Sequence, residues 1–238
     1  MAALVLFDID GTLIDTQGAG VRALARAVET FRGDHIDLRA LDMAGRTDLS
    51  IMREVLAMNS MSSEDGHVGS LAELYLGYLK EEVAARPGRV MPGVRELLSA
   101  LSREKGIHLG LLTGNLEQGA KLKLSAHGLD VFFSVGAFGD KHEDRGELVP
   151  LAIEILFRIK GMWVSSRQCV IVGDTPRDVD CAKRNGSPCI GVATGKHSQQ
   201  DLCASGAQLV IPDLSATREI VSWILRVRDG VGPGTARQ

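Results

Sequence analysis

The segment LVLFDIDGT, residues 4–12, runs from an apolar stretch into two carboxylates that are two residues apart. Because side chains alternate along a strand, Asp8 and Asp10 can face one pocket at the end of a strand formed by Ala3–Phe7. Gly11 allows the chain to turn sharply after them. Two acids in one site repel each other, so the site needs a cation or a shared proton. Alone, the segment is also compatible with a strand end that carries solvated acids.

Short apolar runs recur along the chain and alternate with longer helical patterns. Most of the runs are rich in Val, Ile, Leu or Phe and too short for helices, which is typical of buried strands in a mainly parallel sheet. The predicted strands are Ala3–Phe7, Ile107–Leu112, Val131–Val135, Cys169–Val172, Cys189–Val192 and Gln208–Ile211. The predicted helices are Gly93–Glu104, Leu116–His127, Glu147–Ile159 and Arg177–Asn185. This alternation predicts an α/β fold with a doubly wound, Rossmann-like core.

Residues 17–86 interrupt the alternation. They carry helical patterns and no clear strand, and the pairs Pro-Gly at 87–88 and 92–93 mark the return to the core pattern. The helical patterns are Val21–Phe31, Ser50–Met58 and Gly69–Ala84. We therefore predict a helical insertion, residues 17–86, in an α/β core domain of residues 1–16 and 87–238.

A second acidic cluster follows the predicted strand Cys169–Val172. Asp174 ends this strand and Asp178 comes four residues later, so both acids can face the same side of the turn that enters the next helix. Carboxylate oxygens are hard ligands that suit Mg²⁺, which also accepts phosphate oxygens into its shell. The alternative for Asp178 is that it only stabilises the helix N-terminus.

Two further elements can bind an anion. Thr113, Gly114 and Asn115 place a hydroxyl and an amide between a strand end and a helix start, where ligands bind in α/β sheets. Asn115 and Gln118 also form a possible capping pair for that helix, and taken alone this segment is better explained by plain turn and cap chemistry. A cation before the predicted helix Glu147–Ile159 could balance the charge of a transferring phosphoryl group. From spacing alone this cation could be Arg145 or Lys141, or both could be solvated.

The bulk composition narrows the class of protein. The chain has 238 residues, of which 45% are hydrophobic and 24% charged, as in ordinary globular proteins. A net charge of −3 gives no support for a nucleic-acid or acidic-membrane partner. No apolar run approaches the roughly 20 residues needed to cross a bilayer. The first residues lack the basic region of a signal peptide, so a cytoplasmic location is expected.

Together these elements resemble the haloacid dehalogenase (HAD) superfamily, specifically its phosphatases. The resemblance rests on D-x-D-G-T at Asp8–Thr12, T-G-N at Thr113–Asn115, a basic third motif, and G-D-x-x-x-D at Gly173–Asp178. The helical insertion sits where a C1-type cap sits in that superfamily. The segments GRTD at 45–48 and TGK at 194–196 look like phosphoglycolate phosphatase-like members in particular.

The resemblance implies a role for each acid. Asp8 would be the nucleophile that forms an aspartyl-phosphate. Asp10 would be the general acid and then the general base, with a pKa raised by its environment. Mg²⁺ would be held by Asp8, by the backbone carbonyl of Asp10 and by Asp174, with Asp178 acting through a metal-bound water.

The resemblance also implies how phosphate is held. Thr113 and Asn115, with backbone N–H groups around Gly114, would hold the phosphoryl oxygens. Many relatives have Lys-Pro at the third motif, and this chain has no such pair. Some phosphoglycolate phosphatase-like sequences have Arg in a His-x-x-Arg setting, as in HEDR here, so we prefer Arg145 over Lys141.

The predicted function is Mg²⁺-dependent hydrolysis of a small phosphomonoester, phosphoglycolate-like or a sugar phosphate. The cap would select the substrate, and Arg46 is the candidate substrate-facing cation; a solvated arginine at a helix start is the alternative. No nucleic-acid or membrane partner is expected, and many capped relatives act as monomers or dimers, so a monomer or homodimer is expected here.

Four alternatives compete with phosphomonoester hydrolysis. A β-phosphoglucomutase-like phosphotransferase shares the core motifs and is the main alternative. The family's dehalogenases lack the acid that Asp10 supplies here, and a phosphonatase would need a reactive cap lysine, where this chain has only Lys80, late in a helix. A non-catalytic binding protein on the same fold should have lost at least one of the acids.

Overall fold

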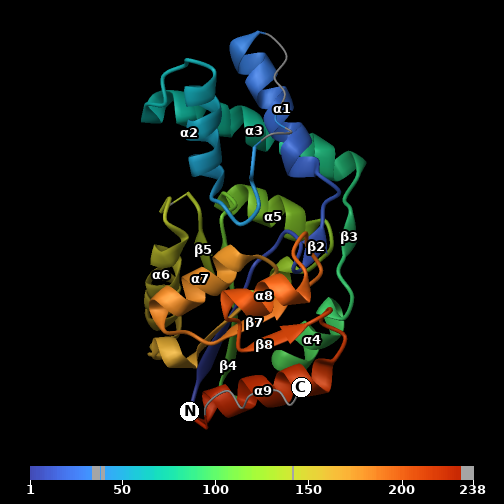
Figure 1. Ribbon diagram of the computed structural model, residues 1–238, viewed down its shortest axis with the longest axis vertical. Coiled ribbons are helices and arrows are strands. Elements are labelled where there is room, and N and C mark those ends of the chain that lie inside the picture. The colour runs from blue at the N-terminus through green and yellow to red at the C-terminus, as the bar shows by residue number, and fades with distance from the viewer. Residues whose placement is uncertain (34–37, 39–40, 141, 232–238) are drawn as a thin grey trace.

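The first predicted strand, β1 (Ala3–Phe7), lies near the centre of a six-stranded sheet, and all of its side chains are fully buried. The computed structural model describes residues 1–33, 38, 41–140 and 142–231 (Figure 1). The other strands of this sheet are β4 (Ile107–Thr113), β5 (Val135–Phe138), β6 (Cys169–Gly173), β7 (Cys189–Val192) and β8 (Leu209–Ile211). Their order is β5-β4-β1-β6-β7-β8, and every adjacent pair is parallel. The predicted doubly wound fold is confirmed.

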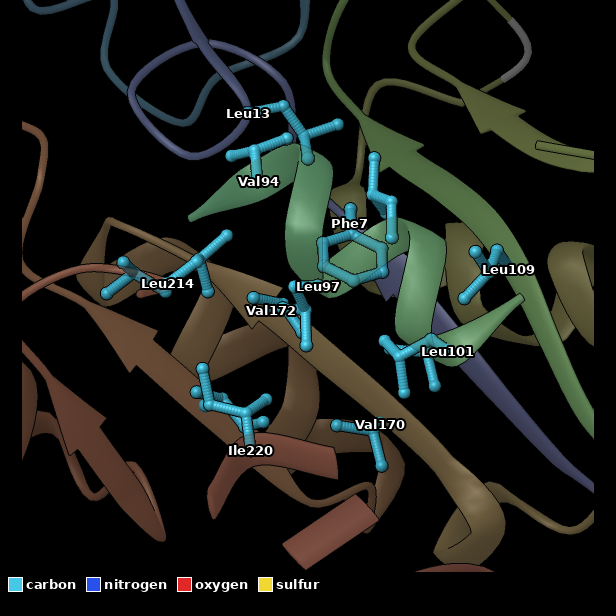
Figure 2. Packing of buried hydrophobic residues seen from close by; sticks show 14 of the residues in the cluster. Phe7, Leu13, Val94, Leu97, Leu101, Leu109, Val170, Val172, Leu214 and Ile220 are labelled. Atoms are coloured by element: carbon cyan, nitrogen blue, oxygen red, sulfur yellow. The ribbon is translucent and has the colours of Figure 1, made fainter. Parts of the chain in front are cut away.

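Helices cover both faces of this sheet, which is why its strands are apolar on both sides. The helices are α4 (Val94–Leu101), α5 (Glu117–Ser125), α6 (Leu148–Lys160), α7 (Pro176–Asn185), α8 (Gln199–Ser205) and α9 (Thr217–Arg228). Ala3, Val5 and Phe7 pack with α4, α5 and α9 on one face, whereas Leu4 and Leu6 pack with α6, α7 and α8 on the other. Figure 2 shows the first cluster around the Phe7 ring. Full burial of each large apolar side chain contributes about 1.5–3 kcal/mol.

The sheet register brings the predicted site residues to one edge. Phe7 of β1 pairs with Leu111 of β4 on one side and with Val172 of β6 on the other. The residues that follow these strands therefore meet at the carboxyl edge of the sheet, where α/β folds bind ligands.

One predicted strand is wrong and two helices were not predicted. The run Val131–Val135 does not form a strand; residues Asp130–Phe132 form a 3-10 helix, and β5 begins only at Val135. Val131 is 80% exposed, so the apolar run that suggested a buried strand lies partly on the surface. The pairing of β5 with β4 selects residues 135–138 instead. Helices α8 and α9 complete the two helical layers.

A helical region lies above the carboxyl edge of the sheet (Figure 1). It contains α1 (Ala19–Arg32), α2 (Asp48–Met58) and α3 (Asp65–Ala85), which confirm the three predicted helices and share a separate apolar cluster. A two-stranded antiparallel ladder, β2 (Ile14–Asp15) with β3 (Arg89–Val90), joins this region to the core. The division of the chain into domains at residues 17 and 86 stays a prediction.

Among the helices of residues 1–33, 38, 41–140 and 142–231, none combines the length and the apolar character that a membrane span requires.

Candidate active site

A cavity of about 400 Å³ lies between the carboxyl edge of the sheet and the cap helices, and it collects most of the predicted site residues. Its lining includes Asp8, Asp10, Arg46, Thr113, Gly114, Asn115, Arg145 and Asp174. Asp178 lies behind this lining, fully buried at the start of α7. Lys141, the alternative cation, lies outside the described residues.

Asp8, Asp174 and Asp178 form a compact acidic cluster. One carboxylate oxygen from each lies within 4.8 Å of the others, and all three residues are buried. Burial raises the pKa of Asp8 to about 6; Asp178 and Asp10 add to the increase and Arg145 opposes it. Burial, with Asp8 and Asp178 nearby, raises the pKa of Asp174 to about 8. Three mutually repelling carboxylates in one buried place could hold a metal ion, and such hard oxygen donors suit Mg²⁺.

The turn after β1 holds Asp174 in this cluster. Thr12 Oγ1 donates a hydrogen bond of 2.8 Å to Asp174 Oδ1. Gly11 has a φ of +87°, and a Cβ there would overlap the Asp174 carboxylate. A side chain at position 11 is therefore excluded both by the backbone conformation and by the close approach of the acid.

Asp178 has two roles in the structure. It forms a capping box at the start of α7, where its Oδ2 accepts hydrogen bonds from the Thr175 backbone N–H at 3.0 Å and from Thr175 Oγ1 at 2.7 Å. Its other oxygen, Oδ1, forms an ion pair with Arg145. Asp178 thus caps the helix, as one of the two predictions from the sequence has it, and its carboxylate also belongs to the acidic cluster.

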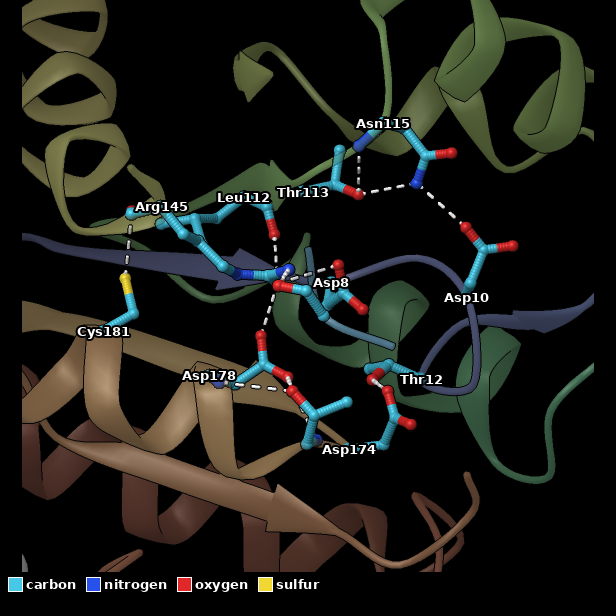
Figure 3. A network of polar contacts seen from close by, with 12 residues as sticks. Asp8, Asp10, Thr12, Leu112, Thr113, Asn115, Arg145, Asp174, Asp178 and Cys181 are labelled. Carbon is cyan, nitrogen blue, oxygen red and sulfur yellow. Dashed lines mark hydrogen bonds and ion pairs between the residues drawn. The ribbon is translucent and has the colours of Figure 1, made fainter. Parts of the chain in front are cut away.

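Arg145 lies at the start of a short 3-10 helix, Arg145–Glu147, and its guanidinium lies between two of the acids (Figure 3). Its Nη2 is 2.9 Å from Asp8 Oδ1, pairs with Asp178, and donates to the Leu112 carbonyl at 3.2 Å. Burial lowers the pKa of Arg145, but Asp178 and Asp8 outweigh this effect and raise it. Among the described residues, the buried Arg145 Nε has no hydrogen-bond partner. A fixed cation beside Asp8 suits an anionic group.

Asp10 has different partners from Asp8, although it lines the same cavity. Its Oδ2 accepts hydrogen bonds from Lys123 Nζ at 2.6 Å and from Asn115 Nδ2 at 2.9 Å, and its Oδ1 accepts one from Thr16 at 3.4 Å. Burial raises the pKa of Asp10, but the Lys123 charge and these hydrogen bonds outweigh it, so the pKa is lowered. The expected increase in the pKa of Asp10 is wrong for this arrangement, because a buried lysine faces the carboxylate.

Lys123 is the residue that sequence reasoning missed. It lies on α5, it is only 4% exposed, and it lines the cavity. One signal was available: Leu116, Ala120 and Lys123 follow the spacing of a core-facing helix side, where a lysine is unusual. Its partner Asp10 is 113 residues away in the sequence, so the contact itself was not visible.

The turn between β4 and α5 differs from the predicted capping arrangement. Leu116 is the N-cap of α5 and makes no side-chain cap hydrogen bond. The Asn115 side chain instead donates to Thr113 Oγ1 at 2.7 Å and to Asp10. The Asn115 side chain therefore hydrogen-bonds to Thr113 and Asp10 in the site and does not cap the helix. Gly114 lies against the cap, and a Cβ there would overlap the Arg46 carbonyl.

The cap side of the cavity is mostly apolar. Arg46 reaches its lining but forms an ion pair with Glu54 and donates to the Ser50 carbonyl at 3.2 Å. Asp48, an acid of the cap, also lines the cavity. Its Oδ2 accepts a hydrogen bond of 2.9 Å from the backbone N–H of Leu116, at the start of α5. The apolar residues on this side are Val21, Leu24, Met43, Ile51 and Met52.

Comparisons with known proteins agree with this geometry. A family model described as Haloacid dehalogenase-like hydrolase matches residues 5–192. A protein named probable phosphatase IndB, from Dickeya dadantii, is 29% identical over 90% of this chain and 91% of its own length. A phosphoglycolate phosphatase from Pseudomonas putida is 28% identical over 90% of this chain and 77% of its own length. The solved β-phosphoglucomutase of Clostridium difficile shares the fold, with a TM-score of 0.73 and 18% identity over 97% of this chain and 99% of that chain.

Proposed function

We propose that this chain, which belongs to the haloacid dehalogenase-like hydrolases, hydrolyses small phosphomonoesters with Mg²⁺ through an aspartyl-phosphate on Asp8. Its similarity to two proteins named as phosphatases supports this proposal. One observation carries the proposal. Asp8, with Arg145 at 2.9 Å, and Asp10, on a separate set of partners, line the same cavity. Two carboxylates with different surroundings can take the roles of nucleophile and of acid and base.

In the first step, an Asp8 oxygen attacks phosphorus while the bond from phosphorus to the ester oxygen breaks. The Asp10 carboxyl gives its proton to the leaving oxygen. A phosphate dianion next to Asp10 favours the protonated carboxyl, because a neighbouring negative charge disfavours ionisation. In the second step, Asp10 takes a proton from water, whose oxygen attacks phosphorus and releases phosphate and the Asp8 carboxylate.

The acidic cluster suits a divalent cation by its donor set. Asp8 and Asp174 would hold it directly, together with the backbone carbonyl of Asp10, and Asp178 would act through a water. When bound, Mg²⁺ supplies positive charge that keeps Asp8 ionised and balances the phosphoryl oxygens. Arg145 supplies further positive charge beside Asp8.

The phosphoryl oxygens would be held by Thr113 and Asn115 and by backbone N–H groups around Gly114. The substrate would be a small phosphorylated metabolite, phosphoglycolate-like or a sugar phosphate. The similarity to a protein named phosphoglycolate phosphatase supports the first class. Arg46 is the candidate for recognition of the rest of the substrate from the cap, once it exchanges Glu54 for a substrate anion.

A phosphotransferase of the β-phosphoglucomutase kind is the second candidate, because such an enzyme shares this fold. It would form the same aspartyl-phosphate and then pass the phosphoryl group to a sugar phosphate instead of water. Incubation with glucose 1-phosphate and a bisphosphate distinguishes the two. Release of inorganic phosphate supports hydrolysis, and formation of glucose 6-phosphate without net phosphate release supports transfer.

The direct test of the proposal is phosphate release from phosphoglycolate, sugar phosphates and nucleotides, with and without Mg²⁺. The wild-type protein should release phosphate from some of these esters only with Mg²⁺. Asp8→Asn should reduce the rate by orders of magnitude while circular dichroism stays unchanged, because the amide is a poor nucleophile. Near-normal turnover in Asp8→Asn would exclude Asp8 as the nucleophile.

We also propose that the protein acts in the cytoplasm as a monomer or homodimer, without nucleic-acid or membrane partners. Sedimentation at several protein concentrations measures the oligomeric state directly.

A further inference from the structure

Lys123 is an unusual residue for the interior of α5. Its side chain is 4% exposed, whereas Lys121, two residues earlier on the same helix, is 66% exposed and pairs with Glu117. Moving an ammonium group out of water is expensive unless it is paired and fully hydrogen-bonded. A leucine at this position would extend the apolar side of α5 at lower cost, so the lysine calls for a reason other than stability.

The contacts of Lys123 form a closed ring of hydrogen bonds. Its Nζ donates to Asp10 Oδ2 at 2.6 Å and to Asn115 Oδ1 at 2.6 Å, and Asn115 Nδ2 donates to the same Asp10 oxygen at 2.9 Å. Because an ammonium group can only donate, it faces the oxygen of the Asn115 amide and turns the amide nitrogen toward Asp10 and Thr113. Lys123 thereby orients both side chains.

The carboxylate of Asp10 needs such support. It belongs to the turn after β1, and its side chain is 40% exposed toward the cavity. Without Lys123 its remaining side-chain contacts are Asn115, whose amide oxygen would lose its Lys123 donor, and Thr16 at 3.4 Å. A carboxyl group held this loosely would sample several rotamers, and proton transfer requires hydrogen-bond contact with the leaving oxygen.

The position of Lys123 relative to the cap is consistent with a role in the closed site. A methyl group added at Gly20 of α1 would lie 3.9 Å from Lys123 Nζ and 3.5 Å from the Tyr75 hydroxyl of α3. Cap helices therefore cover the ring formed by Asp10, Asn115 and Lys123. The leaving group of a bound ester would occupy the space between this ring and the cap.

We propose that Lys123 is a positioning residue for leaving-group protonation: it holds the Asp10 carboxyl where the ester oxygen departs. This inference rests on the proposed phosphatase function and extends it to a residue outside the four motifs. As the bond from phosphorus to the ester oxygen breaks, the proton of the Asp10 carboxyl passes to that oxygen, and Lys123 fixes the distance and direction of the transfer. Lys123 makes no covalent bond.

A purely structural role of Lys123 predicts the same loss of activity for every ester, whereas a role in leaving-group protonation predicts a loss that depends on the leaving group. An ester with an acidic leaving group, such as 4-nitrophenyl phosphate, needs little help from a proton donor, whereas phenyl phosphate needs more. In Lys123→Met, kcat/KM for phenyl phosphate should fall by about 100-fold, the loss expected when a reacting group is misplaced. For 4-nitrophenyl phosphate the loss should be much smaller, and KM should change little for either ester.

The experiment measures kcat/KM with Mg²⁺ for a series of substituted phenyl phosphates. The slope of its logarithm against the acidity of the leaving phenol should be shallow in the wild type and steep in Asp10→Asn. Lys123→Met should be as steep as Asp10→Asn, and the double variant should be no worse than Asp10→Asn alone, because both remove the same step. Lys121→Met is the matched control on the same helix and should keep the shallow slope.

Lys123→Gln keeps an N–H donor near Asp10 and should give an intermediate slope; it also supplies the comparison if Lys123→Met does not fold. An unchanged slope with a uniform loss of activity in both Lys123 variants would overturn the proposal and leave Lys123 a structural residue. Independent losses that multiply in the double variant would overturn it as well. Failure of the phosphatase function is distinguishable, because the wild-type protein would then hydrolyse none of the esters with Mg²⁺.

Discussion

Two aspartates that are two residues apart acquire opposite properties from their surroundings. Asp8 is buried beside Asp178, and its pKa is raised to about 6. Asp10 faces Lys123 and Asn115, and its pKa is lowered. The repeating geometry of a strand therefore directs both acids to one cavity. Burial and residues from other elements, Arg145 and Asp178 for Asp8 and Lys123 and Asn115 for Asp10, decide how each one ionises.

The acidic cluster predicts how the protein responds to metal. Addition of Mg²⁺ should raise the Tm of the wild type, because a ligand bound only by the folded state stabilises it by about 2.7 kcal/mol at 100 times its Kd. Asp174→Asn removes one buried carboxylate and should abolish most of this increase. Asp180→Asn changes an exposed acid on α7 and should keep it. Equal increases in the wild type and Asp174→Asn, measured by scanning calorimetry, would exclude Asp174 as a ligand.

Residue identities predicted the acids and Arg145 that the structure places in one cavity, but they did not predict Lys123. Asp8, Asp10 and Asp174 follow apolar runs, so strand periodicity and the parallel sheet suffice to bring them together. Lys123 was missed because its partner is on a different strand end, and no local pattern reports such a contact. The lowered pKa of Asp10 was missed for the same reason.

At the scale of elements, most strands and helices follow from local sequence, and the exceptions depend on tertiary contacts. The residues of β1 are apolar at every position because helices cover both faces. The apolar run at 131–135 looks similar in the sequence, but Val131 is exposed and β5 starts later, where it can pair with β4. Burial on both sides is a property of the assembled sheet, which explains the error.

The start of α5 provides a pH-dependent contact between cap and core. Asp48 accepts the Leu116 N–H, and its pKa is raised to about 6. Burial is the main cause; Lys123 and the Leu116 N–H oppose it, and Asp10 and Asp140 add to it. Because the folded-state pKa is above the unfolded value near 4, this group favours folding fully below about pH 4, and its contribution is lost as the pH rises through about 6.

Asp48→Asn keeps an acceptor for the Leu116 N–H and removes the titration. The free energy of unfolding of Asp48→Asn, relative to wild type, should therefore increase between about pH 4 and pH 7. Urea unfolding at both pH values measures this difference. Asp42→Asn is an opposite-sign control, because Arg177 lowers the pKa of Asp42 and the relative stability of that variant should fall slightly over the same range. A pH-independent difference for Asp48→Asn contradicts the account.

At the scale of the whole molecule, the cap helices lie over the acidic edge of the sheet and are fastened to it at several points. The backbone N–H of Asp48 donates to the Gly114 carbonyl at 2.7 Å, Arg177 of the core pairs with Asp42 at 2.8 Å, and Arg53 pairs with Glu143 at 2.6 Å. Of these three contacts, we expect the backbone hydrogen bond to matter most for holding the cap on the core, because exposed ion pairs contribute little to stability. In the proposed reaction, a cap held close to the sheet would exclude water from the first chemical step.

Gly114→Ala tests this contact. The added Cβ would overlap the Arg46 carbonyl and the Thr47 backbone, so the cap loop must move away from the turn between β4 and α5. We expect kcat/KM for phosphate esters to fall by about tenfold or more, since small displacements of reacting groups are costly. Gly77→Ala, in α3 with open space around the added methyl group, should retain full activity. Unchanged kcat/KM in Gly114→Ala would show that close docking of the cap is not needed for turnover.

If the reaction proceeds through Asp8, its carboxylate carries a phosphoryl group during turnover, and chemical trapping detects that group. The protein is mixed with an active phosphate ester and Mg²⁺, quenched, and reduced with borohydride, which converts an aspartyl-phosphate to homoserine. Peptide mass spectrometry should then find homoserine at position 8 in the wild type and none in samples without ester. Trapping of the phosphoryl group on another residue, or steady turnover with no residue modified, would contradict the account.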